Sequence, residues 1–168
     1  MRFTADQLRT HLLGLNLPAW QWQLPDVVFA TVANDYAPAV WSAWLDSLRA
    51  NAPECLEQRP VGGGKTRPVP RYIAEAGDCE NHALLMMAHA LMGQWISAAQ
   101  GGARVGRAFG VLFYVAQPRA ENGWRAGGHA KVWWINHAGE FRTFEPGDGE
   151  EQALNPVEIN TAAFGLAA

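Results

Sequence analysis

The sequence has little charge and no long apolar run. Charged residues occupy 17% of its 168 positions, and 13 lysines and arginines against 16 acidic residues give a net charge of -3. Proteins that bind a phosphate backbone usually carry a basic excess, so we expect no nucleic-acid partner. No stretch reaches the roughly 18 apolar residues of a membrane-spanning helix, so we expect no membrane partner. The first residues lack the apolar core of a secretory signal, which predicts a cytoplasmic protein.

Cysteine is scarce as well. The chain contains only Cys55 and Cys79. A single disulfide is not expected in a chain without a secretion signal, so we interpret both residues as free thiols. His82 and His89 lie seven residues apart on one predicted helix and could join Cys79 in a zinc site that stabilises the domain. The spacing matches no compact zinc signature, so we predict no metal site and keep zinc as an alternative.

Apolar residues are plentiful, at 49% of the chain. This content predicts one domain over residues 1–168. We divide it into an N-terminal helical part (1–56), a loop (57–70), a core (71–146) and a C-terminal extension (147–168). The loop is dense in Gly and Pro, which predicts a mobile segment. Its GGGKT run is not expected to bind phosphate, because Arg59 stands where a phosphate-binding loop needs Gly.

The periodicity of the apolar residues predicts helices first and strands afterwards. Helices are expected over residues 5–13, where Thr4 and Gln7 form a capping box, over 38–51, and over 79–98. Aromatic and β-branched runs predict strands at 108–116, 129–136 and 140–146. This order is typical of an α+β fold with an antiparallel sheet.

Cys79 is predicted to lie in the first turn of the longest helix, with Asp78 as the N-cap residue. Free backbone N–H groups and the helix dipole favour a thiolate there. A nucleophilic thiol also needs a base. His129, which begins a predicted strand after two glycines, is the histidine best placed to reach it.

Glu145 is the predicted acceptor that orients His129, and the length of the turn decides whether the two can meet. A two- or four-residue loop would put them on opposite faces of the hairpin. A three-residue loop at 137–139 places His129 diagonal to Glu145 on one face, and Gly139 suits the left-handed position of such a loop. We therefore predict Cys79, His129 and Glu145 as catalytic residues.

Five further residues are candidates for lining the cleft or for holding an oxyanion. Trp20, Gln21 and Gln23, in AWQWQLP, could contribute the second oxyanion donor beside the backbone N–H of Cys79. Asn81 and His82 follow Cys79 closely and could line the cleft. We expect that His82 is not the base, although it is the imidazole nearest to Cys79 in the sequence.

The motifs DCENHA, GGHAKVWW and FRTFEP, over residues 71–146, resemble those of the papain-like and transglutaminase-like cysteine hydrolases. Within that superfamily they look closest to the cysteine-protease domain of a mushroom agglutinin and its phage-encoded relatives. The resemblance implies an α+β core in which the helix that begins at the cysteine packs on an antiparallel sheet. It maps the family's Cys, His and Glu onto Cys79, His129 and Glu145.

The same resemblance implies a function. The chain would be a cysteine-dependent hydrolase, a peptidase, amidase or isopeptidase, that acts by thiol acyl transfer on a peptide or protein substrate and is associated with phage. A catalytically inactive papain-like binding module and a transglutaminase-type acyl transferase are the alternatives. No cofactor is required, and calcium is implied by the resemblance alone. The oligomeric state is not indicated.

Overall fold

The computed structural model describes residues 1–61, 63–73, 78–103, 105–117, 127–162 and 164–167, without the side chains of Trp20 and Phe164. The helices in these residues are α1 (Ala5–Gly14), α2 (Tyr36–Asn51), α3 (Cys79–Ala99) and α4 (Pro156–Asn160), with short 3-10 turns η1 (Ala19–Gln21) and η2 (Pro53–Cys55). The strands are β1 (Arg2–Phe3), β2 (Phe29–Ala30), β3 (Leu56–Pro60), β4 (Thr66–Pro70), β5 (Gly106–Arg107), β6 (Phe109–Ala116), β7 (Gly127–Ile135), β8 (Phe141–Glu145), β9 (Glu150–Glu151) and β10 (Phe164–Ala167).

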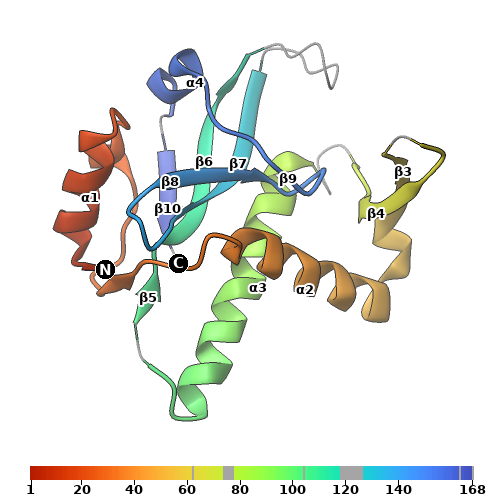
Figure 1. The fold of residues 1–168 in the computed structure, drawn as a ribbon, viewed down its shortest axis with the longest axis horizontal. Coiled ribbons are helices and arrows are strands. Elements are labelled where there is room, and N and C mark those ends of the chain that lie inside the picture. Colours follow the sequence, from red (N-terminus) through yellow and green to blue (C-terminus); the bar gives the residue numbers. More distant parts are fainter. Residues whose placement is uncertain (62, 74–77, 104, 118–126, 163, 168) are drawn as a thin grey trace.

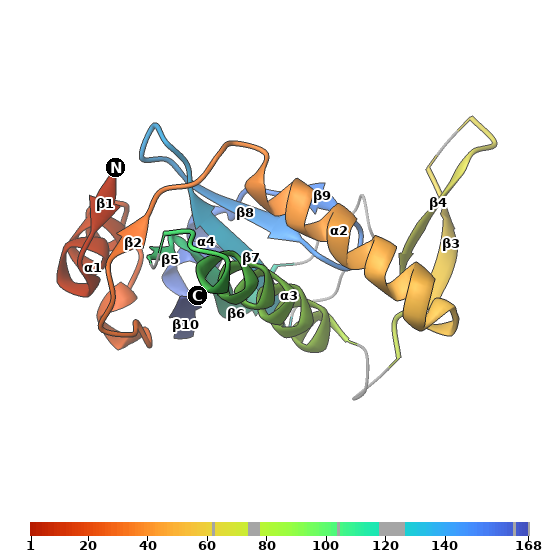
Figure 2. The same ribbon diagram turned by 90° about the horizontal axis from the view of Figure 1, so that it is seen from below.

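A five-stranded sheet in the order β10-β6-β7-β8-β9 forms the centre of the molecule, and all its neighbouring strands are antiparallel (Figure 1). Apolar cores lie on both of its faces. One core joins the sheet to α2 and α3, and the other joins it to α1 and the segment around η1 (Figures 1 and 2). Burial on both sides explains why the sequences of β6 and β7 are nearly continuous apolar runs.

Helix α3 confirms the helix predicted over residues 79–98. It begins at Cys79 because the Asp78 side chain accepts a hydrogen bond from the backbone N–H of Asn81. Ala83, Met86 and Ala90 recur at helical spacing and are buried against the sheet. The capping box predicted for α1 is confirmed too, with both of its hydrogen bonds present between Thr4 and Gln7.

The hairpin of β7 and β8 has the predicted three-residue loop. Val132 pairs with Phe144, and the N–H of Asn136 donates to the carbonyl of Glu140. Gly139 occupies the left-handed region, at a φ of 83°. The register therefore leaves His129 and Glu145 on one face at the end of the hairpin.

The prediction of a loop at 57–70 is wrong, because most of these residues form the two-stranded sheet of β3 and β4. Pro68 and Pro70 lie within β4. Each strand of a two-stranded sheet has an open edge, which tolerates residues without an N–H. The C-terminal extension likewise pairs, since β9 and β10 form the two outer strands of the central sheet.

The predicted fold class, an α+β core like that of papain and transglutaminase, is also corrected. We expected three strands, whereas the described residues form ten strands in three sheets. The additional strands are two to five residues long. Most of these strands are too short to show a period of their own, and prolines interrupt β3 and β4, so the sequence pattern did not indicate them.

Among the described residues, none of the helices has both the length and the apolar content to span a membrane.

Gly110 tests the packing of the central sheet. A methyl group there would collide with the backbone of Leu166 in β10, so Gly110→Ala should lower the free energy of unfolding by about 1–3 kcal/mol. Gly93→Ala, on the open surface of α3, is the matched control and should instead raise it by up to about 1 kcal/mol. Urea denaturation measures both. Equal effects of the two substitutions would contradict the pairing of β10 with β6.

Candidate functional site

Cys79 is the first residue of α3 and is partly exposed, and its sulfur is not part of a disulfide. Its position in the first helical turn leaves its backbone N–H without a partner inside the helix. Asn81 closes the same turn, since both its backbone N–H and its side-chain amide donate to one carboxylate oxygen of Asp78, at 3.2 and 2.9 Å. Asn81 therefore supports the helix start that carries the thiol.

His129 approaches from β7 and meets Glu145 of β8. Its Nε2 donates to Oε2 of Glu145 at 2.6 Å, and the side chains are only 13% and 3% exposed. The ring also packs edge-on against Tyr114, its partner across the sheet, at a centroid distance of 5.6 Å. Because Nε2 is committed to Glu145, Nδ1 is the nitrogen that remains for the thiol.

The charge on His129 is stabilised by both of its neighbours. Burial lowers the pKa of His129, but hydrogen bonds to the Cys79 and Glu145 side chains and the charges of both groups outweigh it and raise the pKa to about 9. The ring is therefore an imidazolium at neutral pH. The structure thus brings the three predicted residues into one hydrogen-bonded cluster.

Glu145 is held by the turn that follows it. Its second oxygen, Oε1, accepts the N–H of Gly147 at 3.1 Å. Two side chains donate hydrogen bonds to the backbone of this turn. Nε1 of Trp41 donates to the carbonyl of Pro146 at 2.8 Å, and Arg59 of β3 donates to the carbonyl of Gly147 at 3.1 Å. These roles of Trp41 and Arg59 were not predicted from the sequence. The only sequence signal was an aromatic residue on a helix and a charge in a presumed loop.

His82 is buried at 4% exposure, and its Nε2 donates to the carbonyl of Arg71 at 3.3 Å. Burial lowers the pKa of His82, although the hydrogen bond to Arg71 and the charge of Glu145 oppose that effect. The ring is therefore neutral at pH 7, next to the turn of Gly147. This geometry agrees with the expectation that His82 is not the base.

The segment AWQWQLP lies away from this cluster. Gln21 is in η1, and Gln23 exchanges backbone hydrogen bonds with Gly165 and Ala167 beside β10. In the sheet, β6 and β7 separate β10 from β8, which carries Glu145. The structure therefore does not bring Gln21 or Gln23 to Cys79. The side chain of Trp20 lies outside the described residues.

Acidic residues near the site are already engaged. Asp148 accepts the N–H of Glu150, and Glu150 pairs with Arg67 of β4. Burial and then the charge of Glu145 raise the pKa of Asp148 to about 6. Within the part of the chain that the structure describes, no group of three or more His, Cys, Asp or Glu side chains could hold a metal ion. The zinc alternative therefore gains no support from these residues.

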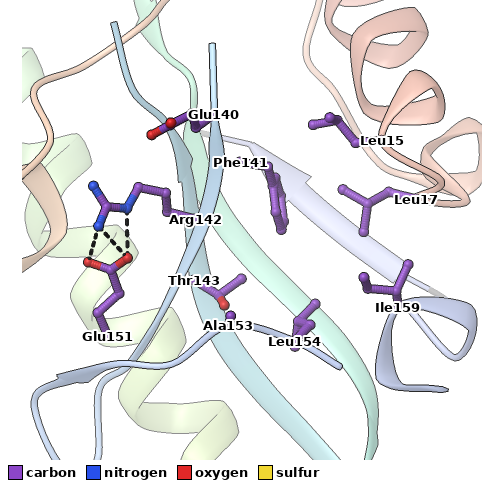
Figure 3. Close-up of a pocket in the computed structure, with 10 residues that line it drawn as sticks. All are labelled: Leu15, Leu17, Glu140, Phe141, Arg142, Thr143, Glu151, Ala153, Leu154 and Ile159. Carbon is purple, nitrogen blue, oxygen red and sulfur yellow. Dashed lines mark hydrogen bonds and ion pairs between the residues drawn. The ribbon is translucent and has the colours of Figure 1, made fainter. Parts of the chain in front are cut away.

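A separate hollow of about 560 Å³ lies between β8, the segment after α1 and the chain around α4 (Figure 3). Leu17, Phe141, Leu154 and Ile159 gather on one side of β8, and the Arg142–Glu151 ion pair lies on the other. None of the predicted site residues lines it.

No protein-family model matches the chain, and no curated protein matches it. Solved structures do share its fold. One, described as the PSL1a–E64 complex, aligns with a TM-score of 0.61 and 17% identity over 98% of this chain and 51% of the other. Another is Polyporus squamosus lectin bound to the human-type influenza-binding epitope Neu5Aca2-6Galb1-4GlcNAc, with a TM-score of 0.59, 18% identity and coverage of 98% and 49%. The chain thus has the fold of about half of a lectin chain.

This finding overturns the predicted family. The matched structures are of a lectin, and no family model identifies a papain-like or transglutaminase-like cysteine hydrolase. The predictions of a hydrolase, of a cysteine-protease enzyme and of a peptide substrate depended on that resemblance and are therefore wrong as well. The physical reason is that three short motifs describe a local geometry, and similar local geometries occur on unrelated folds.

Replacing Glu145 tests the electrostatics of the cluster. In Glu145→Gln the pKa of His129 should fall well below about 9, because the carboxylate charge is lost while burial remains. The contribution of His129 to the free energy of unfolding should be full below its ordinary pKa of about 6.5 and disappear as the pH rises through about 9. Histidine NMR titration and pH-dependent urea denaturation measure these effects. Glu140→Gln, on the same hairpin, should leave the titration unchanged; an unchanged titration in Glu145→Gln would contradict the cluster.

Proposed function

We propose that the protein is a ligand-binding module with a nucleophilic thiol, in which Cys79 forms a covalent bond to an electrophilic ligand. The observation that supports this most directly is the 2.6 Å hydrogen bond between His129 and Glu145. The Cys79 side chain is hydrogen-bonded to the same imidazole. A buried imidazole with an acid on one nitrogen and a thiol on the other is the arrangement that activates a nucleophile.

In the proposed step, the proton of the Cys79 thiol already lies on Nδ1 of His129, and the sulfur joins an electrophilic carbon of the ligand. The bond from that carbon to the displaced atom breaks, and the electron pair leaves with that atom. Where the displaced atom is oxygen or nitrogen, it takes its proton from His129. Glu145 stabilises the imidazolium throughout.

Cysteine labelling tests this proposal. Cys55 is exposed and Cys79 is partly buried, so accessibility alone would make Cys55 the faster thiol. Activation should reverse the order, with iodoacetamide labelling Cys79 at least about tenfold faster than Cys55 at pH 7. Mass spectrometry of the two peptides measures both rates in one sample. Because PSL1a is described in complex with E64, we also expect one equivalent of E64 to bind and to protect Cys79.

Two variants control the labelling experiment. His129→Gln and Glu145→Gln should each slow the labelling of Cys79 to the rate of Cys55 or below it, while the rate at Cys55 stays constant. The proposal fails if Cys79 reacts no faster than Cys55 in the wild type, or if neither variant slows it.

Glycan binding is a second candidate function. It is favoured by the shared fold, because the matched lectin is described in complex with Neu5Aca2-6Galb1-4GlcNAc. This chain matches only about half of the lectin, so the proposal is that this half by itself binds a glycan.

Immobilised Neu5Aca2-6Galb1-4GlcNAc provides the test of this candidate. The protein should bind it, and free trisaccharide should displace the protein at micromolar to millimolar concentration, a range that corresponds to about -8 to -4 kcal/mol. A surface carrying unmodified dextran is the control. Absence of binding to this epitope and to a panel of other glycans would contradict the candidate.

A further inference from the structure

Helix α3 is apolar on both its buried and its exposed face. Opposite the residues that pack on the sheet, it exposes Leu85 (51%), Met92 (59%), Trp95 (71%) and Ile96 (49%). No Asp, Glu, Lys or Arg occurs at positions 81–103. A helix that is apolar all round is ordinarily buried on all sides, but none of the residues that the structure describes covers this face.

The exposed side chains form one continuous stripe. Leu84, Leu91 and the exposed Ala88 and Ala99 complete it at spacings of three and four residues. The 21 residues of α3 span about 30 Å, and its C-terminal half extends past the sheet and α2 (Figure 1). Together the side chains expose on the order of 600 Å², at the top of the range of about 300–600 Å² for the largest patch on a typical monomer.

The stripe is complementary to a second copy of itself. If two α3 helices lie antiparallel with the two-fold axis between Leu91 and Met92, Trp95 of one copy faces Ala88 of the other. In the same register, Leu84 faces Ala99. Large side chains thus meet small ones on either side of the axis, and Leu91 meets Met92 at the axis itself, which gives a self-complementary two-fold interface. Since the stripe carries no charge, the two copies do not repel each other there.

We propose that two copies of the chain associate through α3, antiparallel about a two-fold axis. The area of the stripe is somewhat below the roughly 800 Å² per partner of a standard interface, which corresponds to a weak, concentration-dependent dimer. Cys79 lies at the N-terminus of the same helix, so the dimer carries its two thiol sites at opposite ends of the helix pair. The association does not depend on the proposed chemistry of the thiol.

Sedimentation velocity and light scattering on the full chain test the proposal. The wild-type mass should rise from one chain toward two as the concentration increases through the micromolar range. Trp95→Glu should weaken the association at least tenfold. Val157→Glu, which replaces a 52% exposed side chain on α4, is the matched control and should not change it. A monomer at several hundred micromolar, or a dimer that Trp95→Glu does not weaken, overturns the proposal.

Cross-linking tests the orientation of the two helices. In a background with Cys55→Ser and Cys79→Ser, Met92→Cys lies near the axis and should form an intermolecular disulfide under mild oxidation. Ala99→Cys lies far from its symmetry mate in the antiparallel arrangement and should not. Equal cross-linking at both positions would indicate parallel helices and overturn the antiparallel arrangement.

Discussion

The hydrogen bond between His129 and Glu145 is the interaction on which the rest of the site depends. Glu145 is 2% exposed, and a buried carboxylate costs several kcal/mol unless its oxygens are paired. One oxygen takes the imidazole of His129 and the other takes the N–H of Gly147. Satisfying this carboxylate therefore specifies both the register of the hairpin and the conformation of the turn that follows.

Each neighbouring element contributes to this arrangement. Gly139 allows the three-residue loop that sets the register of β7 and β8, and Trp41 of α2 fixes the turn after Glu145 through the carbonyl of Pro146. Helix α3 begins where its first residue, Cys79, reaches the imidazole. The packing of α2 and α3 on one face of the sheet thus brings a helix start and two strands together.

The cluster of three residues could be predicted because each depends on strong local rules: an N-cap, a glycine turn and the two-residue period of strands. The pairing of β3, β9 and β10 could not. Prolines obscure the strand pattern of β3 and β4, β9 is only two residues long, and β10 pairs with β6, which is far away in the sequence. Trp41 and Arg59 were missed because their hydrogen bonds join elements about 90 to 105 positions apart. The family and the hydrolase assignment failed because local geometry was extended to a whole protein, whereas the shared fold is that of a lectin.

The position of the protons in the cluster tests the account most directly. A neutron structure at pH 7 should show His129 protonated on both nitrogens, with Nε2–H directed at Glu145 Oε2 at close to 2.6 Å and Nδ1 directed at the sulfur of Cys79. A singly protonated His129 turned away from either Glu145 or Cys79 would contradict it.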